Sequence, residues 1–123
     1  MAATVLVVDD STALRRLVCT TLRCEGFVCL EAADGVEALE RLGNQSVELV
    51  LTDQWMEGMD GLELTKAIKA SSNLRRIPVI VLTTDLSPNR REALQRAGAL
   101  GVLGKTIDPE VLVRTVRRAI NAD

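Results

Sequence analysis

Five short apolar runs divide the chain, and they predict β-strands over residues 4–8, 27–30, 48–52, 78–82 and 101–103. The first, third and fourth runs are almost entirely apolar and lack the alternation of a strand with one solvent-exposed face. Such runs are typical of strands that helices cover on both sides. The hydrophobic pattern therefore predicts a parallel sheet between two layers of helices.

Helix-start residues precede the segments that separate and follow these strands. Each is a side chain that can accept a hydrogen bond from the first helical turn, and in two cases proline comes next. The predicted caps are Ser11, Asp34, Asp60, Ser87 and Asp108. Asp34 and Glu37 form a capping-box pattern. Gly26, Gly43 and Gly98 are predicted to close three of the helices.

Apolar residues at helical spacing mark the faces that should pack on the sheet. In the first helix the inward stripe is predicted to include Leu14 and Leu17, and in the second helix it begins at Val36. Val111 and Val113 flank the inward stripe of the last helix, and we expect one of them to be exposed.

Alternating strands and helices with short connections favour right-handed βαβ units. We predict an α/β fold with a flavodoxin-like, doubly wound five-stranded parallel sheet in the order 2-1-3-4-5, flanked by five helices. A length of 123 residues fits one core, so residues 1–123 are expected to form a single domain.

Composition excludes several functions. Aromatic residues make up 2% of the chain, which argues against direct nucleic-acid binding through base stacking. The chain has no histidine, so it cannot use a histidine base, bind metal through imidazole or be phosphorylated on histidine.

The net charge of −2 is unevenly distributed. Residues 1–61 carry 11 acidic and 4 basic side chains, whereas residues 62–123 carry 6 acidic and 11 basic ones. This asymmetry suggests a cation site in one half and a partner surface in the other, although simple segregation of surface charges would give the same counts.

The cysteines and the N-terminus indicate a cytoplasmic protein. Cys19, Cys24 and Cys29 form no CxxC pair, and we interpret them as buried or half-buried thiols in a reducing compartment. The sequence starts without a basic signal-peptide region, and no apolar stretch approaches the roughly 18 residues of a membrane span. No membrane association is expected.

Polar residues stand where the predicted strands end: Asp9 and Asp10, Asp53, Thr83 and Lys105. The carboxyl ends of parallel strands share one edge, where ligands bind beside the reversal of strand order. Carboxylates gathered there repel, because two unit charges about 4 Å apart interact by about 4 kcal/mol at an effective dielectric of 20. Oxygen ligands without imidazole favour Mg²⁺, with Mn²⁺ as a substitute.

Four segments carry a family resemblance: residues 7–11, 53–61, 82–83 and 97–105, which include Val-Val-Asp-Asp-Ser and Asp-Gln-Trp-Met-Glu-Gly-Met-Asp-Gly. Their order and spacing resemble the response-regulator receiver family, and in particular its stand-alone, chemotaxis-regulator type. The resemblance spans essentially the whole chain.

The resemblance implies a magnesium site. Asp10 and Asp53 match the side-chain ligands of the ion, Asp9 matches a ligand that acts through water, and the backbone carbonyl of Trp55 completes the set. We also expect the Trp55 side chain to lie half-exposed at the rim of the site.

The resemblance implies phosphoryl transfer in two-component signal transduction. Asp53 matches the phospho-acceptor, Thr83 the switch hydroxyl and Lys105 the ammonium that pairs with the phosphoryl group. Because the chain has no histidine, the donor must be a phosphohistidine on a histidine kinase or histidine phosphotransfer protein. Such a protein is a signalling phospho-acceptor and catalyses at most its own phosphorylation and dephosphorylation.

Four positions depart from the family pattern. Glu57 replaces a typical proline and is expected to point to solvent. Thr106 replaces a proline that follows a cis bond, so the Lys105–Thr106 bond is either trans or strained, since a cis bond costs about 2.5–4 kcal/mol here. Thr84 replaces a smaller alanine or glycine and is expected to narrow access to the phosphoryl group. Val102 replaces an aromatic residue, so output must be relayed differently, for example by the backbone after Thr83.

The resemblance also implies an output surface formed by the fourth helix, fifth strand and fifth helix. The two helices carry Arg90, Arg91, Arg96, Arg114, Arg117 and Arg118, which are otherwise ordinary surface arginines. A downstream protein would bind this face, or a second copy in a phosphorylation-dependent dimer of an otherwise monomeric protein.

Three other functions have less support in the sequence. Phosphatase-type hydrolases that form an aspartyl phosphate carry the nucleophile after the first strand in an Asp-x-Asp pattern, whereas here the two acids are adjacent. A nucleotide or flavin module lacks support, because neither GxGxxG nor GxxxxGK[ST] occurs. A degenerate receiver that only docks partners is disfavoured by the complete acid set.

Overall fold

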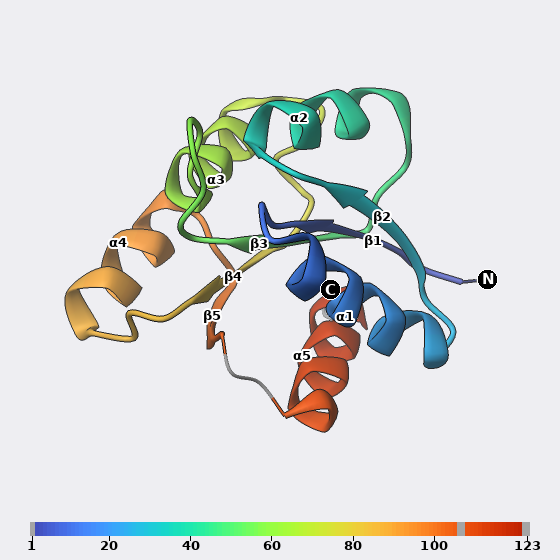
Figure 1. Cartoon of the computed structure of the whole chain (residues 1–123). Helices are drawn as coiled ribbons and strands as arrows, with labels where there is room; N and C mark the ends of the chain where they lie inside the picture. The colour runs from blue at the N-terminus through green and yellow to red at the C-terminus, as the bar shows by residue number, and fades with distance from the viewer. Residues whose placement is uncertain (1, 106–107, 122–123) are drawn as a thin grey trace.

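The computed structural model describes residues 2–105 and 108–121, which form alternating strands and helices (Figure 1). The strands are β1 (Thr4–Val8), β2 (Val28–Ala32), β3 (Leu49–Asp53), β4 (Val79–Thr83) and β5 (Gly101–Gly104). The helices are α1 (Thr12–Cys24), α2 (Gly35–Asn44), α3 (Gly61–Ala70), α4 (Pro88–Ala97) and α5 (Pro109–Asn121).

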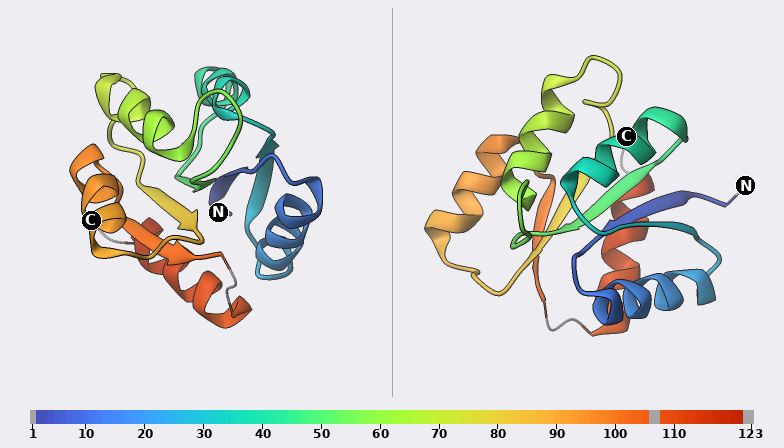
Figure 2. Two further views of the ribbon diagram at one scale, coloured as in Figure 1. Left: turned by 60° about the vertical axis from the view of Figure 1, so that its left-hand side comes forward. Right: turned by 45° about the horizontal axis from the view of Figure 1, so that its top comes forward.

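All strand pairs of the sheet are parallel, and the strand order is β2-β1-β3-β4-β5. Helices α1 and α5 cover one face, and α2, α3 and α4 cover the other (Figures 1 and 2). The predicted flavodoxin-like fold is therefore confirmed. Because the chain leaves β1 toward β2 and then returns to β3 on the other side, the carboxyl ends of β1 and β3 mark the reversal of strand order.

The nearly continuous apolar strands supply two cores. Leu6, Val50 and Val81 belong to the core beneath α2, α3 and α4. Their neighbours along the strands point the other way, and Leu51 and Ile80 belong to the core beneath α1 and α5. Since successive side chains of a strand point to opposite faces, burial on both faces requires apolar residues at every position.

The helix caps largely match the prediction. The side chains of Ser11, Asp34 and Ser87 each accept a hydrogen bond from a backbone N–H in the first turn of their helix. A complete capping box, with both reciprocal bonds, forms at Asp60 and Glu63. The remaining predicted cap, Asp108, accepts from the N–H of the residue two positions later.

One helix end and part of two helix faces differ from the prediction. Gly43 lies inside α2, which continues to Asn44. Leu17 and Val36, predicted to face inward, are 63% and 57% exposed, and Leu14 is also exposed. In α1 the inward face is centred on Cys19 and on Leu22, which was predicted to be buried.

Helix α5 follows the expected pattern, because Val111 is exposed and Val113 is buried. None of the helices in the described part of the chain is both long and apolar enough to cross a membrane.

Candidate functional site

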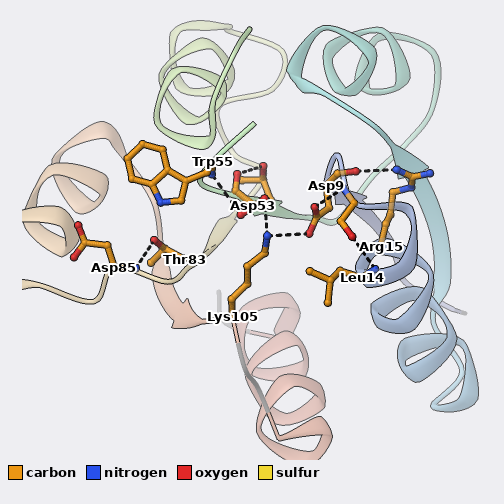
Figure 3. A network of polar contacts seen from close by, with 10 residues as sticks. Asp9, Leu14, Arg15, Asp53, Trp55, Thr83, Asp85 and Lys105 are labelled. Carbon is orange, nitrogen blue, oxygen red and sulfur yellow. Dashed lines mark hydrogen bonds and ion pairs between the residues drawn. The ribbon is translucent and has the colours of Figure 1, made fainter. Parts of the chain in front are cut away.

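The carboxyl edge of the sheet brings the predicted polar residues together (Figure 3). Asp53 and Thr83 are the last residues of β3 and β4, and Asp9 directly follows β1. All three are buried, with Asp53 only 1% exposed. Carboxylate oxygens of Asp9, Asp10 and Asp53 lie within 4.8 Å of one another. The topology thus collects three acids from two adjacent strands at one point.

Lys105 extends over the acids from the end of β5. Its Nζ lies 2.8 Å from Oδ2 of Asp53 and 3.6 Å from Oδ2 of Asp9 (Figure 3). Burial by itself lowers the pKa of Lys105, but the hydrogen bond to Asp53 and the nearby carboxylates outweigh it and raise the pKa. The ammonium is therefore charged at neutral pH and links the two buried acids.

Asp9 is destabilised in its ionised form. Burial raises the pKa of Asp9 above its usual value, and the charges of Asp53 and Asp10 act in the same direction. The backbone N–H of Ser11, which donates to Oδ1 of Asp9 at 2.9 Å, and the charge of Lys105 oppose the rise without cancelling it. Because the folded-state pKa is raised, the free energy of unfolding falls as the pH rises through it.

The donor set fits a hard divalent cation. Two of the three carboxylates are buried and the third, Asp10, is exposed, so an ion could approach from solvent. One ammonium cannot neutralise three carboxylates, and Mg²⁺ binds through a few carboxylates while it keeps several waters. Residues Asp9, Asp10 and Asp53 are therefore the ones that would hold such an ion.

The loop after β3 frames one side of the site. The backbone N–H of Trp55 donates to Oδ1 of Asp53 at 3.4 Å, and the indole is 48% exposed, as expected. Glu57 is exposed, which also matches the expectation. The use of the Trp55 carbonyl as a metal ligand stays a prediction.

The end of β4 frames the other side. The hydroxyl of Thr83 is completely buried and accepts a hydrogen bond from the backbone N–H of Asp85 at 3.0 Å. Thr84 is exposed, and Val102 of β5 is half-buried against the core beneath α2, α3 and α4. Thr106, whose preceding bond was in question, lies outside the described residues.

Sequence reasoning missed Arg15, a residue of α1 that orders the first acidic loop. Its Nη1 donates to the backbone carbonyl of Asp9 at 2.8 Å, and its Nε donates to Oε1 of Glu31 at 2.9 Å. The useful signal was an arginine one turn after the cap of a helix that starts at the site.

Two residues next to Asp53 were also missed. A side chain on Gly61 would place its Cβ 2.5 Å from the carbonyl oxygen of Asp53, so α3 can begin this close to β3 only with glycine. Gln54 is completely buried, and its side-chain amide has no hydrogen-bond partner within residues 2–105 and 108–121. A buried amide without a partner costs about 1–3 kcal/mol.

Fold and site together define a flavodoxin-like α/β domain with an acidic edge that could hold a cation. The sequence profile of the family described as "Response regulator receiver domain" matches residues 5–117. The chain therefore belongs to the response regulator receiver domain family of two-component systems. Receiver domains are signalling modules, and membership implies a histidine kinase or phosphotransfer protein as partner.

Individual relatives agree with this assignment. The chain is 36% identical over 117 residues to two-component response regulator ORR11 of Oryza sativa, across 94% of this chain and 80% of that protein. It is 38% identical over 109 residues to chemotaxis protein CheY1 of Helicobacter pylori, across 87% and 88% of the two chains. The structure of chemotaxis protein CheY4 of Vibrio cholerae superposes with a TM-score of 0.93 at 36% identity, covering 97% of this chain and 99% of that one.

Proposed function

We propose that this chain accepts a phosphoryl group on Asp53 from a phosphohistidine of a kinase or phosphotransfer protein, in a Mg²⁺-dependent reaction. The observation that carries the proposal is the packing of three carboxylate side chains within 4.8 Å of one another, two of them buried, beneath a single lysine. Such an arrangement is costly unless a cation and a second charged group complete it.

The transfer step uses the carboxylate of Asp53 as the nucleophile. An oxygen of Asp53 forms a bond to phosphorus while the bond from phosphorus to the donor imidazole nitrogen breaks. The imidazole keeps the electron pair of that bond and takes up a proton, and the product on this chain is an acyl phosphate. Of the two oxygens, Oδ2 accepts a hydrogen bond from Lys105 at 2.8 Å, whereas among residues 2–105 and 108–121 Oδ1 accepts only from the N–H of Trp55, at 3.4 Å.

The remaining site residues act by position and charge. Mg²⁺ held by Asp9, Asp10, Asp53 and the carbonyl of Trp55 would supply positive charge to the phosphoryl oxygens. Lys105 supplies a second positive charge from the opposite side. Thr83 would release the N–H of Asp85 and donate its hydroxyl proton to a phosphoryl oxygen.

The proposal extends to the organisation and output of the protein. Residues 1–123 act as one receiver domain in the cytoplasm, with no role for nucleic acid. The modified protein presents the face of α4, β5 and α5 to a protein target or to a second copy. Exposed Arg91 and Arg96 of α4 support a basic contribution to this face, whereas Arg114, Arg117 and Arg118 of α5 line a groove against α1. The chain is not an enzyme beyond its own phosphorylation and dephosphorylation.

The test is modification by acetyl phosphate, a small acyl phosphate, with and without Mg²⁺, followed by intact-protein mass spectrometry. We expect wild type to gain one phosphoryl group only when Mg²⁺ is present, and Asp53→Asn to gain none. Glu40→Gln, which neutralises an exposed acid of α2, is the matched control and should behave as wild type. An unmodified wild type, or equal modification of Asp53→Asn, refutes the assignment.

A further inference from the structure

Arg90, in the first turn of α4, contacts both loops that frame the site. Its guanidinium carbon lies 4.8 Å from the centre of the Trp55 ring, and its Nε lies 3.8 Å from Oδ2 of Asp85. The first distance is that of a cation–π contact, and the second is that of an ion pair. One side chain therefore joins the loop after β3 to the loop after β4.

Both partners of Arg90 are bonded to residues of the candidate site through their backbone. Trp55 donates its N–H to Asp53, and Asp85 donates its N–H to the hydroxyl of Thr83 (Figure 3). The contacts therefore form one continuous path, from Asp53 through Trp55, Arg90 and Asp85 to Thr83.

The carboxylate of Asp85 is ionised at neutral pH. Hydrogen bonds from Ser87 lower the pKa of Asp85, and the charge of Arg90 lowers it further. The same bond, from the N–H of Ser87 to Oδ1 of Asp85 at 3.0 Å, fixes the carboxylate at the start of α4. The ion pair thus attaches the first turn of α4 to the loop that follows Thr83.

We propose that Arg90 is a positioning residue that holds the two loops in the arrangement of the unmodified protein and makes α4 respond to the state of Asp53. This inference rests on the proposed function of Asp53. When Thr83 turns to a phosphoryl group, it releases the N–H of Asp85. The loop is then free to move, and the arginine can no longer contact Trp55 and Asp85 together.

The contact path includes an aromatic side chain, Trp55, whereas β5 carries none. Val102 of β5 is aliphatic, and the only other aromatic residue is Phe27, which precedes β2. Trp55 is the single tryptophan, so its fluorescence reports on changes around its indole, including loss of the contact with Arg90. A change in that contact is therefore measurable without a label.

The experiment compares Arg90→Met, Arg90→Lys and the control Arg91→Gln, which removes the neighbouring exposed charge of α4. Without phosphodonor, Arg90→Met should shift the emission of Trp55 to longer wavelength, because the indole loses its cover. With Mg²⁺ and acetyl phosphate, Arg90→Met should be modified about three- to tenfold faster than wild type, which corresponds to about 0.7–1.4 kcal/mol. Arg90→Lys keeps the charge and should fall between the two.

A further readout separates positioning from a merely structural role. Phosphorylation of wild type should change Trp55 emission, and this change should be much smaller in Arg90→Met, whose contact is already broken. If Arg90→Met has the emission and the modification rate of Arg91→Gln, or is modified more slowly than wild type, the inference is wrong. Failure of wild type to be modified at all overturns the proposed function instead, so the two failures are distinguishable.

Discussion

Replacement of Lys105 by methionine tests the electrostatics of the acidic edge most directly. Methionine keeps an unbranched side chain of similar length but removes the ammonium that lies between Asp53 and Asp9. In the absence of Mg²⁺, the variant must keep two buried carboxylates close together without their shared counter-charge. We therefore expect Lys105→Met to be less stable than wild type.

The distances set the size of the effect. At an effective dielectric of 20, charges separated by 2.8 Å and 3.6 Å attract by about 6 and about 5 kcal/mol. The cost of removing lysine from water offsets much of this attraction, and its side chain is still 20% exposed. Loss of one partner from a buried pair costs about 3–5 kcal/mol, so at this open rim we expect a loss of about 2–4 kcal/mol.

Urea unfolding followed by circular dichroism measures this loss without relying on Trp55, which lies in the site. Lys66→Met, on the exposed side of α3, is the matched control and should change stability by less than about 0.5 kcal/mol. Adding Asp53→Asn to Lys105→Met should recover at least about 1 kcal/mol, and Mg²⁺ should also reduce the deficit. A Lys105→Met variant that unfolds like the control would refute the reasoning.

Two further predictions concern packing and thiol chemistry. Gly61→Ala should lower the free energy of unfolding by about 1–3 kcal/mol, because the new Cβ would meet a backbone oxygen of β3. Gly43→Ala should raise the free energy of unfolding by about 0.5–1 kcal/mol, because the space around Gly43 is open. Urea titrations of both variants check this, and equal stabilities would contradict it. Exposed Cys24 should react with a small aromatic disulfide in the native protein, whereas Cys19 and Cys29 should react only on unfolding because both are buried. In addition, the hydrogen bond with Cys29 and burial raise the pKa of Cys19. Three rapidly reacting thiols in native protein would contradict this prediction.

The fold was predictable because each strand is a continuous apolar run and each helix has its own cap. The predicted strand ends were one residue short in β3 and β4, where pairing continues through Asp53 and Thr83. The hydrophobic pattern stops before these residues, since they are polar. At these two ends the strands deliver functional side chains to the edge, whereas β2 and β5 also run past their predicted ends, to Ala32 and Gly104.

The acid cluster was predictable for a topological reason. Residues that follow parallel strands meet at one edge whatever the loop conformations are, so Asp9, Asp53 and Lys105 needed only the strand assignment. Contacts made by long side chains carry no such constraint. Arg15 and Arg90 each lie near the start of a helix. The residues beside them in the sequence do not specify which carbonyl, aromatic ring or carboxylate their side chains contact.

The inward stripes of α1 and α2 were predicted correctly at Leu22 and Leu42, which are buried, and wrongly at Leu17 and Val36 for another reason. Apolar spacing gives the direction of a stripe to within about one residue, and a small residue on the true inward face weakens it. Gly35 and Ala38 are buried in α2, and Val36 lies outside them. The hydrophobic signal of the valine was therefore stronger than the packing evidence from its smaller neighbours.

Two energetically unfavourable groups among the described residues lie next to Asp53. Asp9 is buried with a raised pKa, and Gln54 keeps an amide that finds no partner among the described residues. Both costs lie on the chain segments that also carry the carboxylates, while the two cores on either side of the sheet consist of buried apolar residues. A cation bound here would remove repulsion that is already present among these carboxylates in the free protein. Binding at this edge can therefore rearrange the adjacent loops without loss of the fold, because the energy it releases is local to them.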